Sequence, residues 1–543
     1  MTPYKKAYCI LLAILIMSPP LFSFSPHHDK KPPKLVIGLV IDQMSNEYLK
    51  RYWDDFGKKG FKRLMNEGVF FNRMSLPYFY TSNAAGYATL FTGATPADHG
   101  IIADQWYQSL TNEIVTCTGY NNRNISNEYI KEESLSPGSL ISTTLGDEMK
   151  KRNPLSKVYT ISPDHRAAIL SGGHTADAAF WIDKQFGNWV SSQHYLNSFP
   201  SWIRKFNDKR LIDIYLGRTW NCILPEDHYQ ESLPDKNKYE EGIYDQSVFP
   251  YDLANLRKKT GYKLIRSVPE GNTYTKDFAL ATIMNMKLGA DHHPDLLNII
   301  FSTNRHIERH FGPRSVEMQD TYLRLDRDIG HLLEYIDDHF KQGEVLLFLT
   351  SCNGPMDHPD WLKDQGLPGG YFKSSKALYL LRTYLDVLYG QKELVKFVYK
   401  QQIYLDRNLI NNENLPLKEI QNHIAQFMVQ FNGVADAVPA HVLRENNFNE
   451  GLMGKIKNNY CLKRSGDVMI ILKPGWKEYT EEGNTQQHGA SLPLFLYGWN
   501  LPAQKMNQEI FLHDLAPTLS EITGACKPAL CTGKSLLPLM KLK

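Results

Sequence analysis

The stretch KLVIGLVID, from Lys34 to Asp42, decides the fold class of this chain. It is a continuous apolar run rich in β-branched residues, which is typical of a strand buried on both faces of a parallel sheet. The acidic residue Asp42 stands where the run ends. Similar runs recur along the chain at Lys157–Ser162, Leu296–Thr303, Glu344–Thr350, Asp467–Leu472 and Leu492–Tyr497.

Helical patterns lie between these runs. The segment from Ser45 to Gly68 predicts a helix with Ser45 as its N-cap and Gly68 at its end. From Val316 to Phe340, apolar residues recur at helical spacing. Strands that alternate with helices indicate a mainly parallel sheet covered on both faces. Because ligands bind beyond the carboxyl ends of such strands, we expect functional residues directly after the apolar runs.

Two segments interrupt this alternation. Residues from about 184 to 270 are rich in Trp, Tyr, Asn and Asp without a clear period, which indicates an inserted cap region. Residues from about 365 to 465 carry two helical patterns followed by the apolar run AVPAHVL, which predicts a small α+β subdomain. Both interruptions are interpreted as parts of one domain, residues 26–543.

The first 25 residues predict a secretory signal peptide. Lys5 and Lys6 precede an apolar run from Ala7 to about Phe24, which is broken by Pro19 and Pro20. An uncleaved N-terminal anchor is the alternative. We therefore expect a periplasmic or secreted protein without a membrane span after cleavage. The near-balanced formal charge of +3, without a basic cluster, argues against a nucleic-acid partner.

Six cysteines follow the signal region, and an oxidising compartment would allow them to form disulfides. Cys526 and Cys531 enclose the short segment KPAL and are the pair that we expect to be bridged. The pairing of the other four does not follow from the sequence.

Seven sequence segments follow one another along the chain in an order that indicates a family: VIGLVIDQM, GFKRLMNEG, GYATLFTGATPADHGII, ISPDHRAAILSGGHTADAAFW, FGPRSVEMQDTYLRLDRDI, QHGASLPLFLYG and DLAPTLSEITG. This succession resembles the alkaline phosphatase superfamily, in the branch of monomeric periplasmic phosphatases related to type I phosphodiesterases and nucleotide pyrophosphatases. The resemblance implies a three-layer α/β sandwich with a mainly parallel central sheet, and it covers nearly the whole chain after the signal region.

The resemblance also implies a site of two zinc ions at the strand ends. In that family a Thr or Ser attacks phosphorus, while an Asn, a Lys and an Arg hold the phosphoryl oxygens. One ion activates the attacking oxygen and the other stabilises the leaving oxygen.

The catalytic positions of this chain depart from that pattern. The nucleophile position matches Asn83, whose carboxamide has no alkoxide form. The oxygen-binding Asn matches Asp104, whose negative charge would repel a phosphate. The Lys and Arg match Asp164 and Arg166, so the Arg alone is kept.

The metal positions depart further. Asp42 and His488 remain as one ligand for each ion. Four other ligand positions are replaced, by Arg305, Arg309, Cys352 and Asn353. Zinc sites in proteins take three or four protein ligands, so we expect no cofactor, and zinc only if the chain is an active enzyme.

Several roles remain open for the replacing residues. Arg305 and Arg309 would pair with Asp42, Asp104 or Asp164 in a buried network, or join Arg166 in an anion-binding site. His306 and His310, spaced as a helical metal pair, would form a relocated site with Glu308 or Asp42. Cys352 would be a nucleophile only with an activating neighbour that the sequence does not name.

The sequence therefore favours a catalytically inactive pseudophosphatase that binds a ligand or another protein. The partner would be an anionic small molecule or an envelope protein. One alternative is an active metal-dependent phosphatase or phosphodiesterase with rearranged ligands. The other is a structural component of the cell envelope.

Overall fold

The structure is a computed structural model that describes residues 30–109, 111–119, 134–479 and 491–543 of the 543-residue chain. The chain divides into two compact units, Met1–Pro32 and Pro33–Lys543. The fold below is that of the second unit. The predicted signal peptide, residues 1–25, lies outside the described residues.

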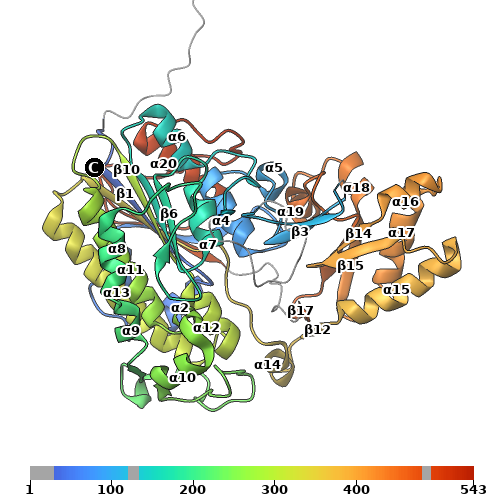
Figure 1. Ribbon diagram of the computed structural model, residues 1–543, viewed down its shortest axis with the longest axis horizontal. Coiled ribbons are helices and arrows are strands. Elements are labelled where there is room, and N and C mark those ends of the chain that lie inside the picture. Colours follow the sequence, from blue (N-terminus) through green and yellow to red (C-terminus); the bar gives the residue numbers. More distant parts are fainter. Residues whose placement is uncertain (1–29, 110, 120–133, 480–490) are drawn as a thin grey trace, which may run out of the picture. The chain divides into compact units, whose positions relative to one another are not determined.

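Within the described residues, a ten-stranded sheet forms the centre of the fold (Figure 1). Its main path runs β19-β2-β18-β11-β1-β10-β5-β6-β7, and β20 pairs with β2. In that order the strands are Gln504–Met506, Val69–Ser75, Leu492–Gly498, Val345–Thr350, Leu35–Ile41, Asp295–Phe301, Val158–Ile161, Ala178–Ile182 and Trp189–Val190, with β20 at Ile510–Phe511.

The five strands β11, β1, β10, β5 and β6 are mutually parallel. Leu35 of β1 stands opposite Asp295 on one side and Val345 on the other. The strand β18 joins the sheet antiparallel to β11 and β2. The prediction of a mainly parallel sheet is therefore confirmed.

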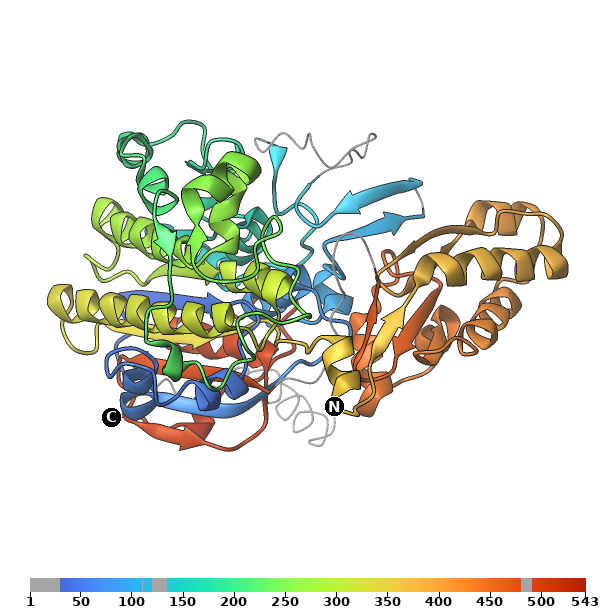
Figure 2. The ribbon, with the colours of Figure 1, turned by 90° about the horizontal axis from the view of Figure 1, so that it is seen from below.

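The two faces of β1 enter two different hydrophobic cores, because successive side chains of a strand point to opposite faces. Leu35, Ile37 and Leu39 pack under helices α2, α3, α11 and α13. Val36 and Val40 pack against α4, α6, α7 and α20. These helices lie along the sheet in Figures 1 and 2. Their bounds are Asn46–Arg51 for α2, Phe61–Glu67 for α3, Glu270–Met286 for α11, Val316–His339 for α13, Asn83–Thr92 for α4, Leu145–Arg152 for α6, His165–Gly172 for α7 and Leu515–Thr523 for α20.

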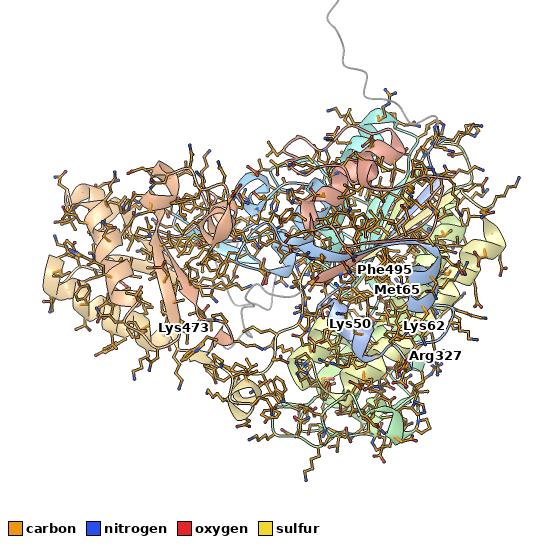
Figure 3. The ribbon with its side chains drawn as sticks, turned by 180° about the vertical axis from the view of Figure 1, so that it is seen from behind. Lys50, Lys62, Met65, Arg327, Lys473 and Phe495 are labelled. Atoms are coloured by element: carbon orange, nitrogen blue, oxygen red, sulfur yellow. The ribbon has the colours of Figure 1, made fainter. Side chains whose placement is uncertain are left out.

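The three layers are thus helices, sheet and helices, which confirms the predicted sandwich. Within the first core, the ring of Phe495 on β18 stacks on Phe70 of β2, with 4.6 Å between ring centroids (Phe495 is labelled in Figure 3). Such aromatic pairs add to the apolar area that their burial removes from water.

The helix predicted from Ser45 to Gly68 is two helices in the structure, α2 and α3. Gly60 precedes α3, and a side chain there would lie 2.2 Å from Asp326 Oδ1, so this position accepts only glycine. Asp326 also accepts hydrogen bonds from the backbone N–H groups of Gly57 and Phe61. A tertiary contact with α13 therefore interrupts the helical pattern.

A second, four-stranded sheet has the order β13-β14-β16-β15. Its strands are Val395–Tyr399, Gln402–Leu405, Val468–Leu472 and Val434–Pro439. Helices α15 (Ser374–Tyr389) and α17 (Leu417–Met428) cover it around a core of its own. The apolar run at Asp467–Leu472 therefore belongs to this smaller sheet, because its strand pairs with β14 and β15.

The remaining elements connect these layers. Between Lys184 and Glu270 lie α8 (Ser201–Asp208), α9 (Leu211–Tyr215), β8 (Thr219–Trp220), η2 (Glu226–His228), β9 (Tyr251–Asp252), α10 (Leu253–Thr260) and η3 (Gly261–Ser267). Elsewhere lie α5 (Pro96–His99), β3 (Gln105–Gln108), β4 (Glu113–Thr116), α12 (Thr303–Phe311), α14 (Pro359–Asp364), β12 (Gly370–Phe372), α16 (Arg407–Asn412), α18 (Ala440–Glu445), α19 (Gly451–Asn459), β17 (Trp476–Glu478), η4 (Leu512–Asp514) and η5 (Leu537–Leu539).

The predicted disulfide between Cys526 and Cys531 is wrong, since both residues are free thiols in the structure. Cys526 is exposed, whereas the Cys531 sulfur packs inward, where a side chain on Gly93 would lie 2.6 Å from it. The two side chains thus have different surroundings.

Among the described residues, no helix is both long and apolar enough to cross a membrane.

Candidate active site

Most of the predicted site residues gather at one edge of the central sheet. Asp42 follows β1, Asp164 follows β5 and Arg305 follows β10. Cys352 and Asn353 follow β11. Because β11, β1, β10 and β5 are neighbours and parallel, their carboxyl ends meet at the same edge. The position after each apolar run was the signal that located these residues in the sequence.

Asp42 is fully buried and accepts several hydrogen bonds from α4. The Tyr87 hydroxyl donates to its two carboxylate oxygens at 2.7 and 2.5 Å. The Asn83 amide nitrogen donates to Asp42 Oδ2 at 3.2 Å. Burial raises the pKa of Asp42 to about 6, against the lowering effect of Arg305 and Tyr87. The carboxylate at the end of the first strand is thus held by protein donors.

Arg305 joins two of the buried carboxylates. Its Nη2 lies 2.8 Å from Asp164 Oδ2, and its Nη1 lies 3.7 Å from Asp42 Oδ2. Burial opposes the charge of Arg305, but Asp164 and its other acidic neighbours outweigh it and raise the pKa of the guanidinium. Burial alone would raise the pKa of Asp164, but Arg305 and Arg166 outweigh burial and hold this pKa well below its ordinary value. Arg305, Asp42 and Asp164 therefore form one network, in which Arg305 and Asp164 stay charged.

Arg309 does not lie with this network. It is exposed near the end of α12, one turn after Arg305. The structure therefore brings together Arg305 and Arg166 of the three arginines that the sequence placed in an anion site, and Arg309 lies apart.

Asp104 faces a cation that the sequence did not reveal. The ammonium of Lys400 lies 2.8 Å from Asp104 Oδ2. Burial alone would raise the pKa of Asp104, but Lys400 and then Arg166 outweigh it and lower the pKa. Arg166 Nη1 in turn lies 3.8 Å from Asp164 Oδ2. Lys400 sits in a turn of the smaller sheet, so no local pattern around it points to this site.

The amides of Asn83 and Asn353 hydrogen-bond to each other, with Asn353 Nδ2 donating to Asn83 Oδ1. Beside them, Cys352 is fully buried and touches α4, where a side chain on Gly86 would lie 2.6 Å from its Cβ. Burial raises the pKa of Cys352 well above its ordinary value. Cys352 is therefore a neutral thiol, which is a poor nucleophile.

His306 and His310 do not form a metal pair with Glu308 or Asp42. Burial, and next the charge of Arg305, lower the pKa of His306 well below its ordinary value. His306 Nε2 lies 3.5 Å from Arg305 Nη2. Glu308 instead accepts a hydrogen bond from the backbone N–H of Met356 at 3.2 Å. A cation beside the imidazole and a separate partner for the carboxylate account for this outcome.

The donor set does not fit the two zinc ions that the family resemblance implies. In the part of the chain that the structure describes, no three His, Cys, Asp or Glu side chains are grouped so that they could hold a metal ion. The candidate edge offers the carboxylate of Asp42, two amides, a neutral thiol and the guanidinium of Arg305. The expected ligand His488 lies outside the described residues.

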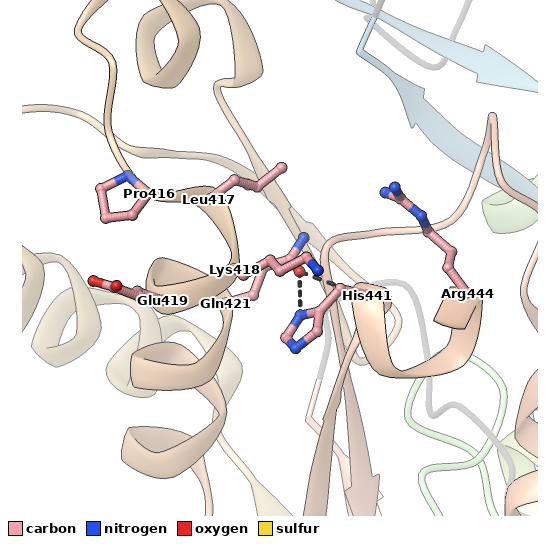
Figure 4. A pocket seen from close by; sticks show the side chains of 7 residues that line it. All are labelled: Pro416, Leu417, Lys418, Glu419, Gln421, His441 and Arg444. Carbon is pink, nitrogen blue, oxygen red and sulfur yellow. Dashed lines mark hydrogen bonds between the residues drawn. The ribbon is translucent and has the colours of Figure 1, made fainter. Parts of the chain in front are cut away.

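A cavity of about 430 Å³ lies apart from this edge, at the beginnings of α17 and α18 (Figure 4). His441 Nδ1 and Gln421 Oε1 lie 2.9 Å apart in its wall. The remaining lining residues are Pro416, Leu417, Lys418, Glu419 and Arg444. The cavity contains none of the site residues predicted from the sequence.

With this fold and this site, the chain belongs to the family of type I phosphodiesterases and nucleotide pyrophosphatases, whose pattern it matches over residues 36–491. A protein named alkaline phosphatase PhoV, from Synechococcus elongatus, is 33% identical over an alignment 560 positions long, which covers 99% of this chain and 100% of that protein. A protein of Myroides odoratus named calcium-transporting ATPase is 34% identical over 92% of this chain and 94% of its own length.

Alkaline phosphatase PafA of Elizabethkingia meningoseptica is 32% identical over 93% of this chain and 94% of its own length. The crystal structure of wild-type PafA matches the structure described here with a TM-score of 0.88, covering 95% of this chain and all of that one. The resemblance to alkaline phosphatases that the motifs indicated is therefore confirmed.

Two expectations drawn from the sequence are contradicted by these relatives. The expectation of an inactive pseudophosphatase is wrong, since proteins named alkaline phosphatases align with this chain nearly end to end. The expectation of no cofactor, which rested on the replaced ligand positions, is contradicted by the same relatives. The replaced residues at the strand ends are thus features of a phosphatase-like chain and are not sufficient grounds for calling it inactive.

Proposed function

We propose that this chain is a phosphoric ester hydrolase that acts on phosphate monoesters. The observation that carries the proposal is the alignment of nearly the whole chain with proteins named alkaline phosphatases. In this chain Asp42 follows β1, and Asp164 and Arg166 follow β5, which is parallel to β1 and separated from it by β10. Open α/β sheets bind their ligands at the carboxyl ends of such strands.

Arg166 is the group that we assign to the phosphoryl oxygens. Its side chain is 37% exposed, whereas that of its neighbour Asp164 is 4% exposed. The Arg166 side chain is therefore the more accessible of the two to a ligand that approaches from solvent. Arginine suits this role because its planar donors match the oxygens of a phosphoryl group.

Asn83 cannot accept the phosphoryl group, because a carboxamide has no alkoxide form. We therefore propose that water is the acceptor. The water oxygen bonds to phosphorus, the ester P–O bond breaks, and the leaving alcohol takes up the proton that the water loses. No step is assigned to zinc, because the described donor set does not fit it.

An assay of the purified full chain with an aryl phosphate monoester tests the proposal. We expect hydrolysis above the buffer rate, and a loss of at least tenfold in Arg166→Met, which removes a charged donor to the phosphoryl group. Arg204→Met is the matched control, since Arg204 is an exposed arginine of α8. The assay is run with added zinc and with a chelator. A folded protein that hydrolyses nothing under either condition would refute the proposal.

We also propose that the chain acts outside the cytoplasm. Lys5, Lys6 and the apolar run to about Phe24 have the composition of a signal peptide. Fractionation of cells that produce the full chain, with N-terminal sequencing of the exported form, tests this. A mature N-terminus near Ser25 is expected, and an uncleaved chain in the cytoplasmic fraction would contradict the proposal.

A further inference from the structure

A tight hairpin turn aims Lys400 at the candidate active site. The strands β13 and β14 are antiparallel and are joined by Lys400 and Gln401 alone. Both residues have positive φ angles, 44° and 64°, as a two-residue hairpin turn of this kind requires. Since neither residue is glycine, the turn holds its shape at a backbone cost, and it fixes where the Lys400 side chain begins.

The end of this side chain is held by Asp104, 296 residues away in sequence. Lys400 Nζ donates to Asp104 Oδ2 at 2.8 Å. The carbonyl of Asp104 accepts a hydrogen bond from the backbone N–H of Cys117 at 2.9 Å, which fixes its position. The sequence predicted that Asp104 would repel a phosphate, but in the structure its charge anchors a cation.

Arg166 and Lys400 are more exposed than two of the three carboxylates that lie around them. The side chains of Arg166 and Lys400 are 37% and 23% exposed. Those of Asp42 and Asp164 are 0% and 4% exposed, and that of Asp104 is 30% exposed. The side of the cluster that solvent reaches is thus richer in positive charge than its interior.

Both cations also have donors beyond their ion pairs. An ammonium carries three N–H groups and a guanidinium carries five. Within the described residues, Lys400 donates a side-chain hydrogen bond to Asp104, and Arg166 lies 3.8 Å from Asp164, which is beyond hydrogen-bond distance. A phosphoryl group bound between them would receive charge-assisted hydrogen bonds from two directions.

We propose that Lys400 and Arg166, with Asp104 as the positioning residue between them, form the subsite for the phosphoryl dianion. This inference rests on the proposed function and names the residues that would give the site its preference for monoesters. A phosphate monoester carries up to two negative charges near neutral pH, whereas a diester carries one. A second cation therefore favours monoesters over diesters. Lys400 acts from the smaller sheet, so the site takes residues from both sheets.

Calorimetric titration with inorganic phosphate tests the subsite without any need for catalysis. We expect Lys400→Met to weaken phosphate binding by about tenfold to a hundredfold, because a hydrogen bond to a charged group contributes about 1.5–3 kcal/mol. The matched control is Lys396→Met on the same hairpin, since Lys396 pairs with Asp406 at 3.4 Å. Lys396→Met is expected to bind like the unchanged protein.

The ratio of kcat/KM for an aryl phosphate monoester to that for the matching diester gives the second test. We expect Lys400→Met to lower this ratio by about tenfold or more, since the dianion loses more than the monoanion when a charge is removed. A uniformly loosened structure would lower both rates together. Lys400→Gln repeats both measurements if Lys400→Met does not fold, as judged by thermal unfolding.

The outcomes separate the two proposals. Phosphate binding that depends on Lys400 in a protein without hydrolysis supports the subsite and refutes the proposed function. Hydrolysis with an unchanged monoester preference in Lys400→Met, and with unchanged phosphate affinity, overturns the subsite alone. A wild-type chain that binds no phosphate at millimolar concentration also overturns it.

Discussion

Two ionisable residues three positions apart on α12, the half-buried Arg305 and the buried Glu308, differ in how their surroundings shift their charge. Arg305 lies between Asp42 and Asp164 and has a raised pKa, so it remains charged. Burial raises the pKa of Glu308 to about 8, although Lys477 acts to lower it. The pKa of Lys477 is itself lowered, by burial first. The region of Arg305, Asp42 and Asp164 keeps its charges, whereas the region of Glu308 and Lys477 is shifted toward its neutral forms.

The difference lies in how many partners each charge has. Arg305 faces two carboxylates, and the second, Asp164, also receives the N–H of Arg166 in its own helix cap. Glu308 has the N–H of Met356 as a donor, and Lys477 donates to the carbonyl of Met356 at 3.1 Å. Removing a charge from water costs several kcal/mol, which close and multiple partners can offset and a single partner cannot.

Arg305→Met should have the largest effect, because it leaves two carboxylates buried without their cation. We expect the free energy of unfolding at pH 8 to fall by about 3 kcal/mol, as for other broken buried ion pairs. The loss should be smaller at pH 5, where Asp42, whose pKa is about 6, is protonated. Urea unfolding at both pH values measures this. An equal loss at the two pH values would show that Asp42 is not part of the network.

Glu308→Gln should change the pH dependence of stability. The pKa of Glu308 is about 8 in the folded protein and 4.5 in the unfolded one. The folded state therefore binds the extra proton between these values, and stability falls as pH rises through this window. Glutamine removes this slope, so the variant should match the wild type near pH 4.5. By pH 9 the variant should be the more stable of the two, because glutamine has no carboxylate to ionise at this buried position.

Chemical unfolding of both proteins in steps from pH 4.5 to 9 provides the measurement. Lys477→Met is the companion variant, because it removes the cation that lowers the pKa of Glu308. Parallel stability curves for Glu308→Gln and the wild type would mean that Glu308 is ionised, so that the two regions of α12 are alike.

Tyr87→Phe should have an intermediate effect, since it removes the hydroxyl that donates to both oxygens of Asp42. We expect a loss of about 1.5–2 kcal/mol in unfolding free energy near pH 8, as for a hydrogen bond to a charged group. The pKa of Asp42 should rise, since Tyr87 lowers it. A pH titration of stability would show the transition at higher pH. Its absence would mean that Arg305 alone holds the carboxylate.

Arg309→Met should have the smallest effect, within about 0.5 kcal/mol, because surface substitutions of this kind seldom change stability more. Arg309 is exposed and shares α12 with Arg305, so it separates the loss of a buried cation from a general loss of positive charge. The same urea unfolding series measures it. A loss as large as that of Arg305→Met would show that Arg309 belongs to the network after all.

The positions at the strand ends could be predicted from the sequence. Asp42, Asp164 and Arg305 each follow an apolar run, and parallel strands bring such positions together. The same pattern could not predict Lys400 or Lys477. Their contacts join elements that are far apart in sequence, and neither lysine stands in a motif. The break between α2 and α3 escaped prediction for a similar reason, since it depends on Asp326 of α13.

By itself the sequence determined the parallel sheet, its two covered faces and the family, because apolar periodicity and ordered motifs are properties of the chain. The tertiary structure alone decided that Asp104 anchors Lys400, that Arg309 stays in solvent, and that Glu308 and Lys477 are shifted toward their neutral forms. Those outcomes depend on which charges meet at a few ångströms and how far each is removed from water, and these are fixed only when distant segments pack together.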